Sequence, residues 1–290
     1  MNLADGFRLS DLDPVTHWGF PASLIPERYW VMLTLYGDET GTHDEKGLEP
    51  GSDVCGIYAY AAWEKDWKKF VRMWNNRLRG KVESFHMNKF MREKEFPYRN
   101  WKTTKRDKFI QSLIKVARDK TCFGWGALLY VPDYDRHVPN DLKKERGHPY
   151  YFSFQLFFDM LLPQLERFDP PLPKGQQVAF FFEENQFQGL ASKAFWDIKT
   201  VRDKNNRLGS ITFLSKGKCV AFQAADMAAW VFKDDLSRQK QGLTRRDWVN
   251  KLIARQNVQV GYYDHKNLAK YVAGVRQTRR LLGAVAPHKK

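Results

Sequence analysis

The strongest constraint on the fold is an unbroken apolar run at residues 178–182, Val-Ala-Phe-Phe-Phe, which is followed directly by Glu183 and Glu184. A strand with one face in water alternates apolar and polar side chains, whereas a strand covered on both faces is apolar throughout. The run therefore predicts a central strand whose sheet has helices packed on both sides. That arrangement is typical of α/β proteins.

A second apolar run, at residues 31–37, also ends in two adjacent acids, Asp38 and Glu39. We expect a buried strand that stops where the acids begin. A strand that carries carboxylates at its C-terminal end is a common way to build a site for a hard metal ion. Further strands are predicted at 54–62, 122–131 and 211–214.

Apolar residues at helical spacing mark segments between the strands. The spacing of Trp67, Phe70 and Trp74 predicts an amphipathic helix over 64–79. Residues 148–168 are apolar on nearly every side, which predicts a helix buried on several sides. A further helix is expected at 220–233.

Two more segments complete the outline. Thr104 and Asp107 resemble a capping box at the start of a helix. Residues 132–148 are rich in Pro, Asp, Lys and Arg and predict an exposed loop that could act as a lid. Strands come first and then alternate with helices, so we expect an α/β fold with a mixed sheet.

The chain has 290 residues, enough for one large domain or two small ones. Residues 1–30 contain three prolines and scattered aromatic residues, and predict an irregular N-terminal arm. We assign the catalytic domain to residues 31–236. Residues 237–290 are expected to form a C-terminal helical extension packed on the same domain.

The chain carries 48 Lys and Arg against 33 Asp and Glu, a formal charge of +15. A surface with this excess attracts polyanions, so nucleic acid is the expected partner. The other interpretation is a basic protein with no nucleic-acid role.

Cysteine content and hydropathy exclude several classes. Cys55, Cys122 and Cys219 are far apart in sequence, so neither a zinc site nor a disulfide framework is indicated. Unpaired cysteines suit a reducing cytoplasm, where we expect this protein. There is no secretory signal pattern and no apolar run of the ~20 residues that span a bilayer, so no membrane partner is expected. Nucleotide-binding glycine loops and metalloprotease or hydrolase motifs are also missing.

Asp226 is the third unusual acid, because it lies within an otherwise apolar helix. A buried carboxylate costs several kcal/mol unless it is paired or binds metal. A distant Lys or Arg could pair with it, which is the alternative for Asp226 taken alone. Taken together, the acids at 38, 183 and 226 are oxygen ligands of the kind that suit magnesium or manganese.

The residues around these acids resemble a known family. Asp38-Glu39-Thr40-Gly41 resembles the Asp-Glu-Ser-Gly signature of the bacterial domain of unknown function 3800 family, with Thr in place of Ser. Gln223-Ala-Ala-Asp226 resembles that family's Gln-x-Ala-Asp motif, and Leu214-Ser215-Lys216 precedes it as the family's strand-Ser-Lys element does. Glu183 falls where the family has an acid after a central strand, and His86 where it often has a histidine.

This family looks like a ribonuclease-H-type fold, so the resemblance implies a ribonuclease-H-like mixed sheet flanked by helices and metal-dependent nuclease chemistry. Family members are often associated with mobile elements and phage defence. The candidate catalytic residues are Asp38, Glu39, Glu183 and Asp226, and the candidate metal ligands are Asp38, Glu183 and Asp226. Supporting roles are expected for Glu184, His86, Glu83, Gln223, Thr40 and Lys216.

The resulting hypothesis is a nuclease that uses magnesium or manganese to hydrolyse phosphodiester bonds in DNA or RNA. One alternative is a catalytically inactive module on the same fold that binds nucleic acid or a partner protein. Another is an enzyme acting on a small phosphorylated substrate, which predicts a narrow closed pocket. A homo-oligomer, or a partner protein in a defence system, is compatible with the nuclease hypothesis.

Overall fold

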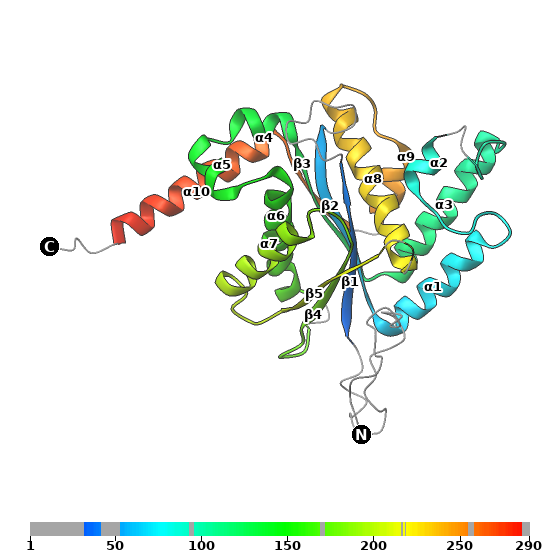
Figure 1. Cartoon of the computed structure of the whole chain (residues 1–290), viewed down its shortest axis with the longest axis horizontal. Helices are drawn as coiled ribbons and strands as arrows, with labels where there is room; N and C mark the ends of the chain where they lie inside the picture. The colour runs from blue at the N-terminus through cyan, green and yellow to red at the C-terminus, as the bar shows by residue number, and fades with distance from the viewer. Residues whose placement is uncertain are drawn as a thin grey trace, which may run out of the picture.

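The computed structural model describes residues 32–41, 53–92, 96–168, 172–215, 217, 219–254 and 258–285. Figure 1 shows a central sheet with helices on both sides. The predicted arm at 1–30 and the candidate residue Lys216 lie outside the described residues.

The sheet has six strands in the order β5-β4-β1-β2-β3-β6. Strand β2 is antiparallel to both β1 and β3, while β4 is parallel to β1 and to β5, and β6 is parallel to β3. The predicted mixed sheet is therefore confirmed. The strands are β1 (Leu33–Thr40), β2 (Val54–Trp63), β3 (Phe123–Tyr130), β4 (Val178–Glu183), β5 (Leu208–Leu214) and β6 (Val258–Tyr263).

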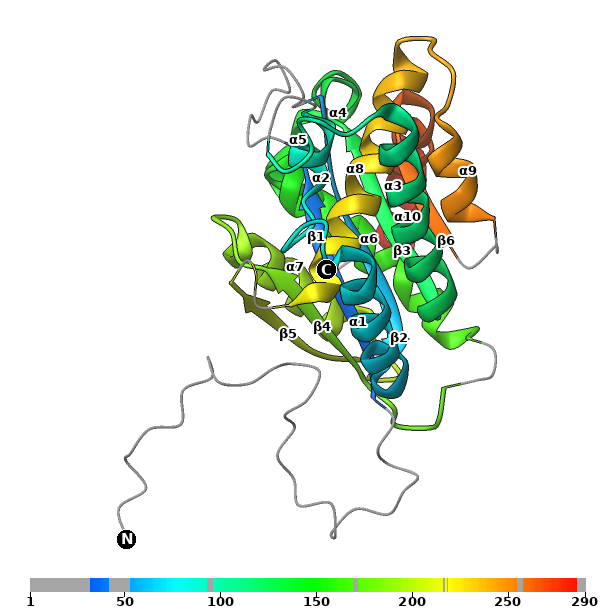
Figure 2. The same cartoon turned by 90° about the vertical axis from the view of Figure 1, so that its right-hand side faces the viewer.

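Helices cover both faces of the sheet, as predicted. On one face lie α1 (Glu64–Leu78), α2 (Met87–Met91), α3 (Thr103–Lys120), α8 (Val220–Lys240) and α9 (Asp247–Ile253), with α8 packed directly on β1 and β2. On the other lie α4 (Val131–His137), α5 (Asn140–Arg146), α6 (Pro149–Glu166), α7 (Gln188–Val201) and α10 (His265–Val285). Figure 2 shows α8 crossing in front of the sheet with α1 and α3 beside it.

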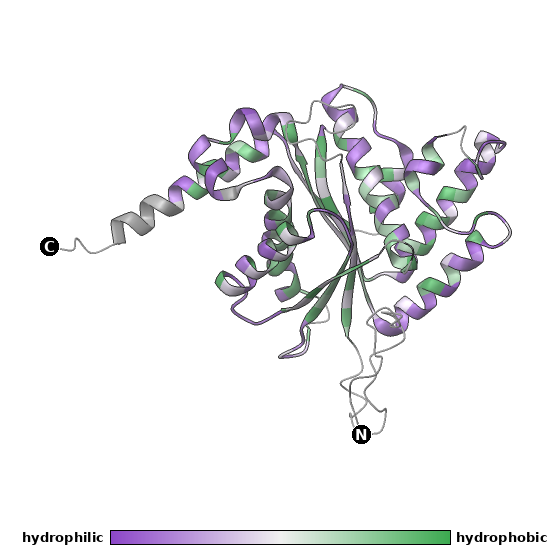
Figure 3. Ribbon diagram, viewed as in Figure 1, coloured by the Kyte–Doolittle hydropathy of each residue, from purple (hydrophilic) through white to green (hydrophobic). Residues whose placement is uncertain are grey.

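Strand β4 divides its side chains between two hydrophobic cores. Phe180 and Phe182 belong to the core under α6 and α7, whereas Ala179 and Phe181 belong to the core under α8. All six residues of β4 are buried, which confirms the prediction of a central strand covered on both faces. Figure 3 shows apolar strands between helices whose outer surfaces are polar.

The helix at 149–166 is confirmed as a buried helix, with 13 of its residues buried. None of the helices in the described ranges is long and apolar enough to cross a membrane.

Two local predictions are wrong. Residues 132–148 form α4 and α5 instead of an exposed loop, because Tyr134, Val138 and Leu142 are buried at four-residue spacing between the charged residues. The capping box is also not formed: α3 starts at Thr103, its N-cap is Lys102, and no side chain caps it.

The C-terminal extension, which we predicted as helical, contains α9 and α10 and also contributes a strand. Strand β6 pairs with β3 at the edge of the sheet. Its side chains are only partly buried, so the segment lacks the strong apolar pattern that marks the central strands.

Replacing Phe180 by Ala should lower the free energy of unfolding by about 3–5 kcal/mol, because it empties a fully buried ring position. Phe180 lies edge-on to Phe158 and Phe195, with ring centroids 5.3 and 5.8 Å away. Urea denaturation measures the change. The matched control is Phe96→Ala at a ring that is 89% exposed, which should change stability by less than about 0.5 kcal/mol. Equal losses in the two variants would contradict the two-core description.

Candidate active site

The pairing of β1 with β4 brings two of the predicted acids together. Gly37 pairs with Phe182 in a parallel register, and Asp38 and Glu183 are the next residues on the two strands. Both carboxylates are buried, with Asp38 at 6% and Glu183 at 8% exposure. The two acids therefore lie on neighbouring strands at the same C-terminal edge.

Their side chains point to the face covered by α8. Tyr36 and Phe181 stack against each other on that face, with ring centroids 5.2 Å apart. Side chains alternate between faces along a strand, so the residues two positions after these rings share their face. Asp38 and Glu183 are those residues, and they lie beneath α8.

Helix α8 places Asp226 over the same part of β1. Phe222 contacts Tyr36 with ring centroids 5.8 Å apart. Farther along the helix, Phe232 stacks on Tyr58 at 5.2 Å, and Tyr58 is the β2 partner of Asp38. Asp226 lies between these two contacts, so its turn of α8 crosses the C-terminal half of β1. Asp226 therefore lies on the same face of the sheet as Asp38 and Glu183, but among the described residues the three acids do not form a group arranged to hold one metal ion.

The Gln223–Asp226 motif ties α8 to the segment between α1 and α2. The amide oxygen of Gln223 accepts hydrogen bonds from the Trp74 indole N–H (3.0 Å) and the Phe85 backbone N–H (2.9 Å). The Asp226 carboxylate accepts one from the backbone N–H of Met87 (2.8 Å). Both side chains therefore help to fix the position of this segment.

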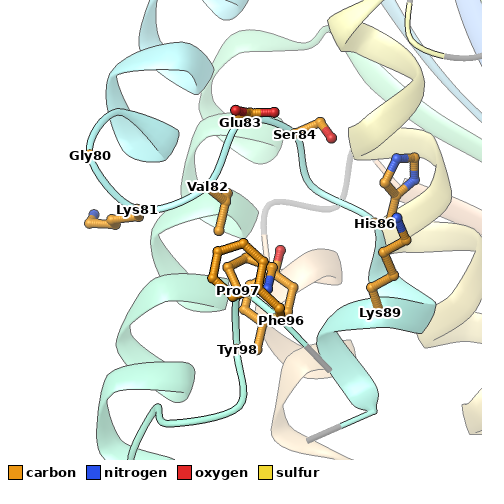
Figure 4. A pocket seen from close by; sticks show the side chains of 10 residues that line it. All are labelled: Gly80, Lys81, Val82, Glu83, Ser84, His86, Lys89, Phe96, Pro97 and Tyr98. Carbon is orange, nitrogen blue, oxygen red and sulfur yellow. The ribbon is translucent and has the colours of Figure 1, made fainter. Parts of the chain in front are cut away.

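The supporting residues of that segment line a pocket. His86 is half-buried and precedes α2, and Glu83 is exposed. Both line a pocket of about 480 Å³ together with Tyr98, whose pKa is raised to about 12, mainly by burial. Figure 4 shows His86 and Glu83 around this pocket.

On the α6 side of the sheet, Glu39 interacts with Tyr150, and Tyr150 accepts a hydrogen bond from Asn185; the sequence analysis missed both of these partners. Burial, and next the charge of Glu39, raise the pKa of Tyr150 well above its ordinary value. Asn185 Nδ2 donates to the Tyr150 hydroxyl at 3.1 Å. The only sequence signal for Asn185 is its place two residues after Glu183, and Tyr150 is hidden in an apolar helix.

Two further candidates, Glu184 and Thr40, are not buried. Glu184 is exposed, and its backbone N–H donates to the Leu214 carbonyl at 2.9 Å. Thr40 is half-buried at the end of β1, opposite Gly56. Of the two adjacent acids that end β4, only Glu183 is buried with Asp38.

The donor set has the chemistry of a hard-ion site. Asp38, Glu183 and Asp226 offer only carboxylate oxygens, the ligands that magnesium and manganese prefer. Within the part of the chain that the structure describes, no group of three His, Cys, Asp or Glu side chains is arranged to hold a metal ion. Magnesium is often held by one or two carboxylates, with water and substrate oxygens completing its shell. Asp38 and Glu183, buried at the ends of adjacent strands, supply two carboxylates of this kind.

Comparison with known proteins identifies no family. No protein-family model matches the chain. There is also no match among curated proteins. The resemblance to the domain of unknown function 3800 family therefore stays a prediction.

Two solved structures show a distant likeness. A mutant form of Bst-RNase HIII aligns with a TM-score of 0.40 and 15% identity, over 89% of this chain and 71% of that one. Ribonuclease H2 from Pyrococcus horikoshii OT3 aligns with a TM-score of 0.37 and 13% identity, over 85% of this chain and 99% of that one. Both scores are low, so neither protein's activity is carried over to this chain.

Replacing Gln223 by Met should lower the free energy of unfolding by about 2–4 kcal/mol, because it leaves two buried N–H donors without their acceptor. Chemical denaturation measures the loss. Gln188→Met, at an exposed position on α7, is the control and should change stability by less than about 0.5 kcal/mol. If both variants behave like the parent protein, Gln223 does not hold the 85–87 segment.

Proposed function

We propose that this protein is a metal-dependent nuclease that hydrolyses phosphodiester bonds in nucleic acid. The observation that carries the proposal is the placement of Asp38 and Glu183, two buried carboxylates at the ends of adjacent parallel strands. Helix α8, which carries Asp226, packs on β1 above this face. A formal charge of +15 supports a polyanionic substrate.

Asp38 and Glu183 would hold a magnesium or manganese ion, and Asp226 would contribute from the helix above. Such an ion stabilises developing negative charge on phosphate oxygens and lowers the pKa of a bound water. The protein residues keep the carboxylates oriented: Met87 N–H binds Asp226, and burial limits the motion of Asp38 and Glu183. On the other face, the Tyr150 hydroxyl lies beside Glu39.

A catalytically inactive nucleic-acid-binding module is the second candidate. It is favoured by one observation: the described residues contain no ready-made three-donor metal group. This alternative keeps the positive surface and the fold without turnover. Metal-dependent product formation separates the two functions.

Asp38→Asn and Glu183→Gln should each lower cleavage at least about 100-fold, because each removes a charged ligand of the ion that stabilises the transition state. The assay follows cleavage of labelled single-stranded and duplex DNA, RNA and hybrids with magnesium or manganese. Chelation by EDTA should abolish product. Asp226→Asn should also lower the rate.

Glu184→Gln is the matched control, because it makes the same change at the exposed neighbour of Glu183. It should retain the parent rate. If every substrate is left intact by the parent protein with either metal, or if Asp38→Asn cleaves normally, the nuclease proposal fails.

A further inference from the structure

Two adjacent hollows lie on the side of the molecule formed by α1, α2 and α3. The first is the pocket of about 480 Å³ lined by the loop that follows α1, by His86 and Lys89, and by Phe96 and Tyr98. The second, of about 350 Å³, lies between the end of α1 and the start of α3. Lys81 lines both of them, so the hollows share a wall.

Five cations line these hollows. They are Arg77, Lys81, Lys89, Lys105 and Lys108, all exposed. None of them forms an ion pair with a carboxylate among the described residues. These five positive charges, which lack carboxylate partners among the described residues, outnumber the one acid of the lining, Glu83, and form a site for an external polyanion.

Three other cations on the same helices are paired with carboxylates. On α1, Lys68 pairs with Glu64 at 2.7 Å and Lys69 with Asp66 at 3.3 Å. On α3, Lys115 pairs with Asp119 at 2.7 Å.

Aromatic rings are interleaved with these cations. Phe96 is 89% exposed at the rim of the first hollow, and Tyr98 lies behind it. In the second hollow, Trp101 is half-buried, and Lys105 Nζ lies over its ring, 4.1 Å from the ring centre. An exposed ring beside lysines can stack on an unpaired base while the lysines bind the flanking phosphates. Bases within a duplex cannot be stacked on in this way.

The first hollow adjoins the candidate active site. His86 lines it, and the next residue, Met87, donates its backbone N–H to Asp226 at 2.8 Å. A strand that lies in the hollows therefore passes beside the segment bound to the acid on α8. Figure 4 shows His86 and Lys89 on one side of the pocket and Lys81 on the other.

We propose that the two hollows bind a single-stranded segment of nucleic acid, with an unpaired base stacked on Phe96 and the backbone phosphates on Lys81, Lys105 and Lys108. The inference deepens the proposed nuclease function by naming its substrate as a single strand, and its link to cleavage rests on that function. DNA and RNA share the recognised chemistry.

The first test measures binding of labelled 16-nucleotide single strands by fluorescence anisotropy in EDTA, over a range of salt concentrations. Combining Lys81→Gln, Lys105→Gln and Lys108→Gln should reduce the slope of log K against log salt by about 2, at about 0.7 per lost phosphate contact. The control variant combines Lys68→Gln, Lys69→Gln and Lys115→Gln, with the same change in net charge. It should keep the parent slope. Equal slopes in the two triple variants would overturn the phosphate assignment.

The second test addresses the unpaired base. Phe96→Ala should weaken single-strand binding about tenfold, as expected for loss of one stacked base, and should not affect an abasic strand of equal length. Trp196→Ala, at a half-exposed ring on α7, is the control and should bind like the parent. Duplex binding as tight as single-strand binding, or unchanged binding by Phe96→Ala, would overturn the inference.

Separate arms with DNA and RNA of one sequence show which sugar the hollows accept. Because EDTA is present, binding does not depend on catalysis. If these results hold but no substrate is ever cleaved, the nuclease proposal fails and the strand site remains. If cleavage requires Asp38 but the substitutions in the hollows leave single-strand binding unchanged, only the inference about the strand site fails.

Discussion

The parallel pairing of β1 with β4 is the constraint on which the candidate site depends. It is fixed by close packing: a Cβ atom on Gly37 would come within 2.4 Å of Phe182 Cε1, so glycine is required for the ring to lie over β1. A slip of one residue would turn a whole strand to the opposite core. That slip would move Phe180 and Phe182 out of the core under α6 and α7, where they pack, and into the core under α8. The same register places Asp38 beside Glu183.

The acids at this edge contrast with the charge of the whole molecule. Asp38 and Glu183 are buried beneath α8, while the net charge of the chain is +15. A positive surface concentrates polyanions near the protein, and the acids form a small negative centre inside it. Gln223 and Asp226 connect the two regions, because they bind the segment that separates the site from the basic hollows.

Much of the fold could be predicted because its central elements are strongly patterned. Strand β4 and helix α6 are apolar on all sides, and both were expected as buried elements. The short helices α4 and α5 were missed because few buried residues are scattered among many charged ones. Strand β6 was missed because its side chains are only half-buried. Within the site, the strand-end acids were visible as apolar runs that stop abruptly, whereas Tyr150 and Asn185 come together only through tertiary packing.

The most direct test of the central claim is a crystal structure of the protein grown with manganese, in which anomalous scattering locates the ion. The account predicts an anomalous peak bound by carboxylate oxygens of Asp38 and Glu183, at about 2.0–2.2 Å as for other hard ions of this size. Substitution Asp38→Asn should remove the peak. A fully ordered site without a peak, or a peak bound by other residues, would contradict the claim that these two strand ends form a metal centre.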